Sequence, residues 1–300
     1  MDKIDVILCQ LLLTDSRRSY RELANQLKLS VNSVHKRIQA LRESGIIRAF
    51  TAKISILALN AQVIWIFGRS EGHSFDEIRG RLAANDRINW AAIAGGNYLY
   101  VMAHLQNISE MEAVVDFVRR EASVPSPTVG VESFPYQTTD LTLHPLDYQI
   151  LYALRNDSRR AVSDIAEELG VSAKTVHRRL SKMIESGMVQ LSFEWYPDAS
   201  NDIFTLCHLS LKPSSNKAEV ISLLYSKYSP NVIWTINFSN LTDQLILAIW
   251  ANTMKGFKEI KENLEKEGLF ENIVPNILFS GQIFDTWRDK LVAERGAPPK

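Results

Sequence analysis

Cysteine is scarce in this chain, with only two among 300 residues. Cys9 lies in the apolar segment VILCQLLL and Cys207 in FTLCHLSL. Free cysteines are among the most buried residue types, so we predict two buried thiols and neither a disulfide nor a metal pair. His208 follows Cys207 directly, but further ligands at a suitable spacing are missing, and we predict no metal site.

Long apolar runs are also missing. Hydrophobic residues make up 46% of the chain and charged residues 23%, as in an ordinary globular protein, and no run approaches the roughly 18 residues of a membrane helix. The first residues, MDKIDVILCQLLL, lack the basic start and the cleavage site of a signal peptide. We therefore expect a cytoplasmic protein without membrane contact, long enough for two domains or more.

Common catalytic motifs do not occur. There is no phosphate loop of the GxxxxGK[ST] kind, no GxSxG nucleophile turn and no HExxH metal helix, so we predict neither an enzyme nor a cofactor. The net charge is zero, which taken alone argues against a nucleic-acid partner, because binding to phosphates requires basic surface. The local distribution of charge leads to a different conclusion.

What the chain does contain is a duplication. Residues 34–45 read VHKRIQALRESG, and residues 176–187 read VHRRLSKMIESG, 142 positions further on. The similarity extends without a gap over residues 4–47 and 146–189. This length and agreement indicate a tandem repeat.

Each copy is predicted to form three helices. In the first copy, one helix runs to about Leu13, and Ser19 with Glu22 forms a capping box that starts a second helix ending near Leu27. Ser30 caps the third helix, which Gly45 closes. Two short helices joined by a three-residue turn are typical of a helix-turn-helix, and IIRAFTAKISI, which follows, could form the two short strands of a wing. The apolar stripe of the third helix comprises Val31, Val34, Ile38 and Leu41.

A looser repeat follows each helix-turn-helix. The segments that follow the two copies both show the predicted order strand, helix, strand, strand, helix, strand. This order is typical of a ferredoxin-like antiparallel sheet with two helices on one face. The predicted fold class is therefore α+β, with two winged helix-turn-helix modules alternating with two ferredoxin-like modules. The predicted domains are 1–60 (winged helix-turn-helix), 61–143 (ferredoxin-like), 144–200 (second winged helix-turn-helix), 201–285 (second ferredoxin-like) and 286–300 (C-terminal tail).

The pattern of the helix-turn-helix, followed at once by a ferredoxin-like sheet, resembles the leucine-responsive regulator/AsnC (Lrp/AsnC) family, whose sheet is called the RAM domain. The likeness covers nearly the whole chain, twice, and differs in the tandem arrangement, since family members commonly carry one copy and pair as dimers. The residues that carry the match in the first copy are Asp5, Asp15, Arg17, Glu22, Leu23, Ala24, Leu29, Ser30, Arg37, Gly45 and Ile47.

The resemblance implies a sequence-specific DNA-binding transcriptional regulator with double-stranded DNA as its partner. Siroheme decarboxylases resemble the same fold, including fused two-copy chains, and form the alternative from another class. Their strand motif places a histidine before Asn-Tyr, whereas Asn89-Trp90 here has no preceding histidine. A scaffold that binds proteins and not DNA is the third alternative.

The third helix of each copy would enter the major groove. Placing successive residues 100° apart sets a polar arc opposite the apolar stripe, and its N-terminal part is expected to contact base edges. The corresponding residues differ between the copies at every position. The predicted base-contacting residues are Asn32, Ser33 and Lys36 in the first copy and Lys174, Thr175 and Arg178 in the second.

Basic residues near this arc are candidates for phosphate contacts, which position a protein on DNA. For Arg37 an alternative is that it packs beside the first helix and bonds an acid such as Asp5. The two histidines either pack or contact phosphate. The predicted phosphate-contacting residues are Arg17, Arg18, His35 and Arg37, with Arg159, Arg160, His177 and Arg179 in the second copy.

Charge distinguishes the two copies. Residues 1–50 hold nine Lys and Arg against five Asp and Glu, whereas residues 146–195 hold seven against seven. Glu167 and Glu168 stand in the second copy where the first has neutral residues. We therefore expect the first copy to bind DNA more strongly than the second.

The sheets are expected to mediate association. Either the two sheets of one chain pair with each other, or two chains pair, and we expect a homodimer. Gly95, Gly96 and Asn97 lie between two predicted strands, where a hairpin turn requires positive φ angles. The resemblance implies that a small effector such as an amino acid binds near this turn. The aromatic residues that supply apolar area are Trp65, Phe67, Trp90, Tyr98 and Tyr100 in the first sheet and Trp234, Phe238 and Trp250 in the second.

Overall fold

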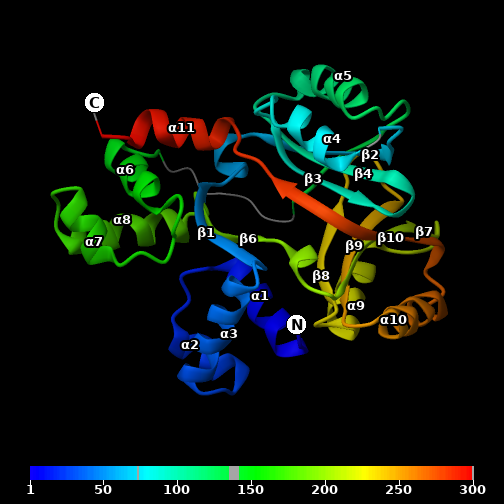
Figure 1. Cartoon of the computed structure of the whole chain (residues 1–300), viewed down its shortest axis with the longest axis horizontal. Helices are drawn as coiled ribbons and strands as arrows, with labels where there is room; N and C mark the ends of the chain where they lie inside the picture. Colours follow the sequence, from blue (N-terminus) through cyan, green and yellow to red (C-terminus); the bar gives the residue numbers. More distant parts are fainter. Residues whose placement is uncertain (73, 135–141, 299–300) are drawn as a thin grey trace. The chain divides into compact units, whose positions relative to one another are not determined.

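The computed structural model describes residues 1–72, 74–134 and 142–298 (Figure 1). They form two compact units, each assembled from both halves of the sequence. The sheet unit comprises Met1–Ile7, Val63–Phe134 and Pro197–Phe284, and the helix unit comprises residues 8–62, 142–196 and 285–298. The α+β class with two helix-turn-helix modules, each followed by sheet strands, is confirmed.

The first helix-turn-helix begins its helices where the sequence predicts. Ser19 Oγ accepts from the Glu22 amide at 3.1 Å and Glu22 Oε2 accepts from the Ser19 amide at 2.7 Å, so the capping box is present. Val31 is 49% exposed, so its predicted place in the buried stripe is wrong, because the first turn of the helix extends beyond the module core. This module contains α1 (Lys3–Thr14), α2 (Tyr20–Leu27), α3 (Val31–Glu43), β1 (Ile47–Ile54) and the turn η1 (Leu57–Leu59).

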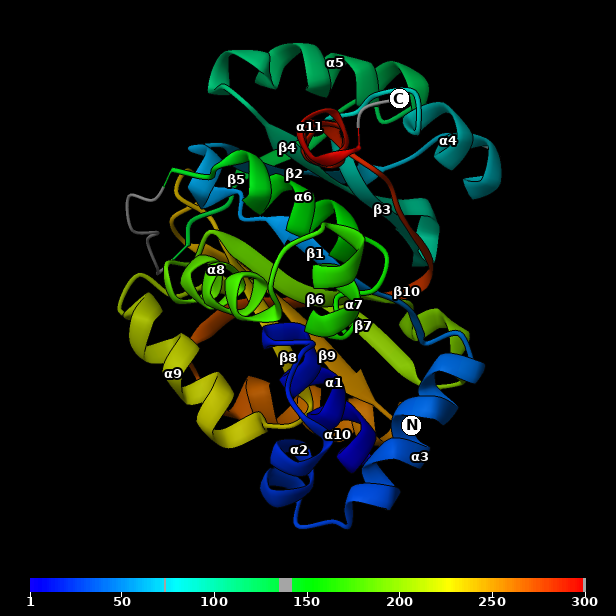
Figure 2. The same ribbon diagram turned by 90° about the vertical axis from the view of Figure 1, so that its left-hand side faces the viewer.

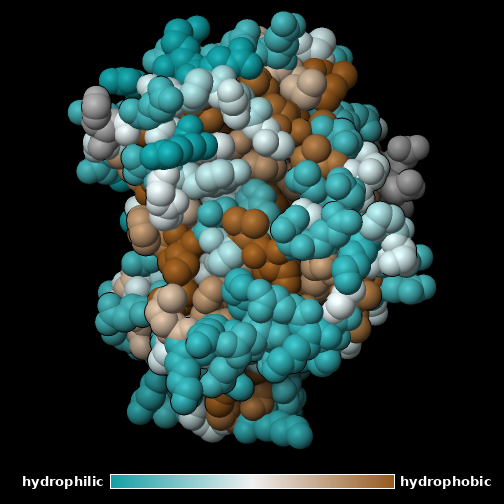
Figure 3. Space-filling model, turned by 90° about the vertical axis from the view of Figure 1, so that its right-hand side faces the viewer, coloured by the Kyte–Doolittle hydropathy of each residue, from teal (hydrophilic) through white to brown (hydrophobic). Residues whose placement is uncertain are grey.

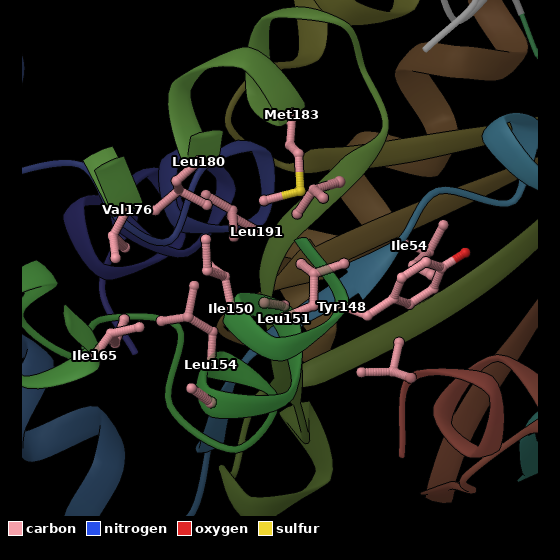
Figure 4. Close-up of a cluster of buried hydrophobic side chains, with 14 of the residues drawn as sticks. Ile54, Tyr148, Ile150, Leu151, Leu154, Ile165, Val176, Leu180, Met183 and Leu191 are labelled. Carbon is pink, nitrogen blue, oxygen red and sulfur yellow. The ribbon is translucent and has the colours of Figure 1, made fainter. Parts of the chain in front are cut away.

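The second helix-turn-helix has a continuous apolar core. Figure 4 shows side chains from its three helices converging with Leu191 of the following strand and Ile54 of β1. The segment predicted as a tail forms a helix that packs on the first helix of this module; a β-carbon at Gly296 would lie 2.2 Å from the Tyr148 carbonyl oxygen, so only glycine fits there. The elements are α6 (Pro145–Leu154), α7 (Val162–Glu168), α8 (Ala173–Glu185), β6 (Val189–Trp195) and α11 (Trp287–Gly296).

The predicted pair of short strands after Gly45 is wrong. The segment continues as the single strand β1, since it contains no turn residues that would fold it into a hairpin. β1 pairs antiparallel with β6 of the other copy, with Phe50 opposite Phe193 and Thr51 opposite Ser192. Figures 1 and 2 both show these two strands side by side, joining the two helix-turn-helix modules.

The turns after the first helix of each module reinforce this pairing. Ser16 and Ser158 are fully buried, and their hydroxyl oxygens lie 2.6 Å apart. The Ser158 amide donates to the Phe50 carbonyl at 3.0 Å, and the Ser16 amide donates to the Leu191 carbonyl at 3.0 Å. Each turn is therefore bonded to the strand of the other module.

Two arginines complete the contact between residues 15–18 and 157–160, which we call the DSRR turns. Arg17 Nη1 donates to two carbonyl oxygens of the second turn, at 2.5 and 2.9 Å. Arg159 Nη1 donates to two carbonyl oxygens of the first turn, one of them at 3.1 Å. Burial and the neighbouring Arg159 guanidinium lower the pKa of Arg17. The accepting carbonyls are those of Ser158 and Arg160 for Arg17, and of Ser16 and Arg18 for Arg159.

The sheet unit contains both ferredoxin-like modules, in the predicted element order. The first consists of β2 (Gln62–Arg69), α4 (Phe75–Leu82), β3 (Ile88–Ala94), the turn η2 (Gly95–Asn97), β4 (Tyr98–Leu105), η3 (Ile108–Glu110), α5 (Met111–Glu121) and β5 (Thr128–Val131). The second consists of η4 (Pro197–Ala199), β7 (Ile203–Leu211), α9 (Lys217–Tyr228), β8 (Val232–Asn237), β9 (Gln244–Ala251), α10 (Met254–Lys266) and β10 (Phe270–Ile283).

The two four-stranded sheets join into one sheet of eight strands, in the order β5-β2-β4-β3-β10-β7-β9-β8. The long strand β10 makes the junction, because its first half pairs with β7 and its second half with β3. The two edge strands also meet: the Ser133 amide donates to the Asn237 carbonyl at 2.7 Å, and the Ser239 amide donates to the Val131 carbonyl at 2.9 Å. The sheet therefore closes on itself, which leaves few unpaired edges.

The strands of this sheet are buried on both faces. Alternate residues such as Leu99 and Val101 pack against α4 and α5 in one apolar core, and β7 and β9 pack in the same way against α9 and α10. The opposite face carries aromatic residues, and Trp65, Tyr100 and Trp250 are at most 5% exposed. The apolar area on which the homodimer prediction rests is thus largely covered within one chain.

Some apolar surface remains exposed. Figure 3 shows one face, on which apolar side chains gather near the middle between hydrophilic areas. On β10, Phe279 is 65% exposed and Val274 is 52% exposed. Within the described ranges, no helix has both the length and the apolar character of a membrane span.

We predict that Arg17→Ala and Arg159→Ala each lower the free energy of unfolding by about 1–3 kcal/mol, because each variant leaves partly buried carbonyls without their charged donor. Urea unfolding followed by circular dichroism measures the change. Arg21→Ala, at an exposed position on α2, is the matched control and is expected to change stability by less than about 0.5 kcal/mol. Equal stability of all three variants would contradict the role of the arginines in joining the modules.

Candidate nucleic-acid interface

The recognition helix of the first module, α3, begins with an exposed polar turn. The Ser30 hydroxyl accepts from the Ser33 amide at 3.1 Å and lies 2.9 Å from the Ser33 hydroxyl, so Ser33 is engaged in capping. Asn32 and Lys36 are exposed. Of the three predicted base-contacting residues in this module, these two present side chains that make no hydrogen bond within the described chain.

The second recognition helix, α8, repeats this arrangement with different side chains. The Ser172 hydroxyl accepts from the Thr175 amide at 3.1 Å and lies 2.9 Å from the Thr175 hydroxyl. Lys174 and Arg178 are exposed. Both modules therefore hold one hydroxyl in the cap and present two longer polar side chains, which are an amide and one cation in α3 and two cations in α8.

The predicted phosphate-contacting arginines divide into two groups. Arg17 and Arg159 hold the DSRR turns together, as described above. Arg18 and Arg160 lie further out, and here the two modules differ. Arg18 Nη1 donates to Gln26 Oε1 at 3.0 Å, whereas Arg160 Nη2 forms an ion pair with Glu168 Oε2 at 2.7 Å. The acid predicted to weaken the second module thus pairs directly with one of its cations.

The remaining candidates lie beside the recognition helices. Arg179 Nη1 contacts both carboxylate oxygens of the buried Asp147, at 2.9 and 3.0 Å. This is the packing alternative that the sequence offered for the equivalent arginine, Arg37, here seen in the second copy. His35 and His177 are exposed, and the His35 ring lies 5.2 Å from the Tyr20 ring.

The turn expected to bind an effector is a tight connection between β3 and β4. Gly96 has φ 68° and Asn97 has φ 57°, so the turn requires the positive φ angles that the sequence predicts. A β-carbon at Gly95 would lie 3.8 Å from the ring of Phe279 on β10. Effector binding at this turn stays a prediction.

The sequence did not indicate a polar cluster on the aromatic face of the sheet. The Tyr100 hydroxyl lies 2.6 Å from His208 Nε2 and accepts from Asn276 Nδ2 at 2.7 Å. Burial lowers the pKa of His208 to about 4, so the imidazole is neutral at neutral pH. Alternation along β7 places Cys207 and His208 on opposite faces of the sheet, which excludes a shared metal. The three polar residues come from three strands, so only the fold brings them together.

A buried carboxyl lies where the sheet closes. Glu132 bridges to Phe238 between β5 and β8, and Glu132 Oε2 accepts from Trp65 Nε1 at 2.7 Å. Burial raises the pKa of Glu132 to about 7. Burial therefore favours the protonated carboxyl group in the folded chain, whereas in the unfolded chain the carboxyl group is ionised at neutral pH.

Comparisons with known proteins agree with this architecture. Residues 1–48 match a family model for winged helix-turn-helix DNA-binding domains, and residues 144–184 match the AsnC-type helix-turn-helix domain. An HTH-type transcriptional regulator of Pyrococcus horikoshii is 32% identical over 117 residues, covering 38% of this chain and 79% of that protein. The regulator LrpC of Bacillus subtilis is 28% identical over 121 residues, covering 40% and 83%.

A solved structure resembles the whole chain. The crystal structure of the siroheme decarboxylase NirDL covers 98% of both chains with a TM-score of 0.61 and 16% sequence identity. At this identity the likeness shows the fold, and it extends over both helix-turn-helix modules and both sheets.

The capped recognition helices and the sheets that follow them define a helix-turn-helix protein with a duplicated architecture. Within that class, the chain belongs to the Lrp/AsnC-type helix-turn-helix family.

We predict that Glu132→Gln flattens the dependence of stability on pH. The folded-state pKa of Glu132 is raised, so its contribution to stability is full below the unfolded value of about 4.3 and is lost as the pH rises through about 7. Urea midpoints measured between about pH 4 and pH 8 should therefore fall more steeply for the natural chain than for the variant. Glu112→Gln, at an exposed position on α5, should keep the natural slope. Parallel curves for all three proteins would show that Glu132 is ionised in the folded state.

Proposed function

We propose that the chain is a sequence-specific DNA-binding regulator of transcription that uses two unlike recognition helices. The observation that carries this proposal is the exposure of Asn32, Lys36, Lys174 and Arg178 at the N-terminal halves of α3 and α8. None of them makes a hydrogen bond or ion pair within the described residues. Donors in this position fit the helix-turn-helix mode, in which the start of the second helix contacts base edges in the major groove.

The pairing of the two modules supports the proposal. Dimeric helix-turn-helix proteins bind two half-sites through two symmetry-related helices. In this chain, both modules belong to one polypeptide, and the pairing of β1 with β6 joins them. One chain thus carries two recognition helices, and its two half-sites are expected to differ in sequence, since the contacting residues differ. The predicted homodimer is not needed for this function and stays a prediction.

We further propose that the chain has no enzymatic activity. The candidate that the fold likeness favours is decarboxylation of siroheme, the activity named for NirDL. Siroheme carries several carboxylates, which require cationic partners in a binding site. The aromatic face of the sheet holds the neutral groups of Tyr100, His208 and Asn276, bonded to one another. Titration with siroheme separates the alternatives: a saturable shift of the Soret band, followed by loss of carboxylate, would favour the enzyme.

We predict that the double variant Asn32→Ala, Lys36→Ala loses preference for the selected DNA site over a scrambled duplex. Each good base contact discriminates by about 1–3 kcal/mol, so the preference should fall by about tenfold or more. In vitro selection gives the site, and fluorescence anisotropy measures both affinities. Lys255→Ala, at an exposed position on α10 in the sheet unit, is the control and should leave the preference unchanged. Equal loss on both duplexes would contradict base recognition by α3.

We predict that Glu168→Gln and Gln26→Glu change DNA affinity in opposite directions. Glu168→Gln removes the acid that pairs with Arg160 and leaves one more cation for phosphate, so affinity rises and its salt dependence steepens by about one unit of slope. Gln26→Glu places an acid beside Arg18 in the first module and should lower affinity and flatten the slope. The two variants exchange a carboxylate and an amide in opposite directions at equivalent positions of the two modules. Each variant is therefore the control for the other. If neither substitution moves the salt slope, these arginines do not contact phosphate.

A further inference from the structure

Arg288 is a buried cation whose nearest acid, Asp289, is paired with Lys53. It lies in the first turn of α11 and is 4% exposed. Only Nη1 makes a hydrogen bond, to the Ile54 carbonyl at 2.9 Å, and Nε has no partner among the described residues. No carboxylate in the described chain forms an ion pair with it, since the neighbouring Asp289 pairs with Lys53 at 3.0 Å. Burial lowers the pKa of Arg288 to about 10, yet the guanidinium still carries its charge at neutral pH.

A buried guanidinium with one hydrogen bond is costly, because the desolvation of a charge is offset only by a partner charge or by several hydrogen bonds. Natural chains rarely keep such a group without a reason. The single neutral carbonyl of Ile54 satisfies one of the five N–H donors of the arginine. A group with spare acceptor oxygens would satisfy the others.

The space for such a group is present. Arg288 lines a hollow of about 450 Å³ between α11, β1 and β6, within the helix unit. This volume lies in the range of sites for small molecules. Charged side chains from several elements line it, together with apolar residues such as Ala52 and Val292. Those that matter for its charge are Lys53, Arg155, Glu194, Asp285 and Lys290.

The charges around the hollow favour an anion that also bears a donor group. Lys53 and Asp289 form an ion pair with each other, and Arg288 is the buried cation of the lining. Glu194 and Asp285 line the same hollow, and burial raises the pKa of Glu194. A ligand with an acid group at Arg288 could therefore place an amino or hydroxyl group against these carboxyls.

We propose that the hollow between α11, β1 and β6 is a binding site for a small organic acid whose carboxylate or phosphate oxygens accept hydrogen bonds from Arg288. The site lies in the helix unit and is separate from the turn Gly95–Asn97 in the sheet unit. A ligand there contacts β1, which pairs the two helix-turn-helix modules, and α11, which packs on α6. The inference concerns binding and does not depend on the proposed recognition of DNA.

The test is a titration of the full chain with inorganic phosphate, acetate and glycine, followed by calorimetry and by the rise in melting temperature that binding to the folded state produces. Binding of phosphate alone, or of acetate and glycine alone, identifies the acid group. Tighter binding of glycine than of acetate identifies a donor contact with Glu194 and Asp285. Failure of all three probes to bind at millimolar concentration would overturn the proposal.

Two variants and one control locate the site. Arg288→Met keeps the length of the side chain and should weaken binding about tenfold or more, as expected for the loss of charge-assisted hydrogen bonds. Ala293→Leu fills the hollow without removing Arg288 and should also abolish binding, so the test holds if Arg288→Met fails to fold. Arg295→Met, on the same helix but outside the hollow, should bind as the natural chain does. Unchanged affinity in a folded Ala293→Leu variant would overturn the proposal.

Discussion

The pairing of β1 with β6, fastened by the two DSRR turns, is the contact on which the arrangement of the helix unit depends. Its hydrogen bonds run from arginine side chains and amides to backbone carbonyls, so they require the conformation of each turn and little else. Asp15–Arg18 and Asp157–Arg160, which form this contact, are identical in sequence, whereas the exposed faces of α3 and α8 differ. Each turn is bonded to the other copy through the side chains of Arg17 and Arg159 and through the Ser16–Ser158 hydroxyl pair.

Pairing within one chain removes a constraint that a dimer of identical chains obeys. Two identical chains present two identical recognition helices, whereas here Asn32 and Lys36 stand against Lys174 and Arg178. Because the two copies can differ in sequence, Glu168 pairs with Arg160 in the second module, whereas the first module has Gln26 at this position. Pairing within one chain also allows α11 to pack on α6, so that the hollow beside Arg288 is lined by α11, by β6 of the second module and by β1 of the first. The duplication is symmetric where the modules meet and asymmetric where they face solvent.

The sequence predicted the features that neighbouring residues determine. Caps such as Ser19 with Glu22, the helical periods and the βαββαβ order are set by residues close in the chain, and the structure confirms them. It did not predict contacts between residues far apart. The partner of β1, the engagement of Arg17 and the meeting of Tyr100, His208 and Asn276 all join segments more than one hundred positions apart. Arg288 belongs to the same group, since its hydrogen bond reaches back to Ile54.

The fold is shared with a decarboxylase, so function has to be argued from the side chains that the fold presents. On the aromatic face of the sheet, Tyr100, His208 and Asn276 are hydrogen-bonded to one another, and burial holds His208 neutral by lowering its pKa. A ligand there would displace bonds already made. Beside Arg288, by contrast, the buried guanidinium donates from Nη1 to one carbonyl, its Nε has no partner among the described residues, and open space lies next to it. Arg288 can gain hydrogen bonds from a ligand in this space, which supports the proposed binding site in the helix unit, next to β1, the strand that pairs with β6 of the other module.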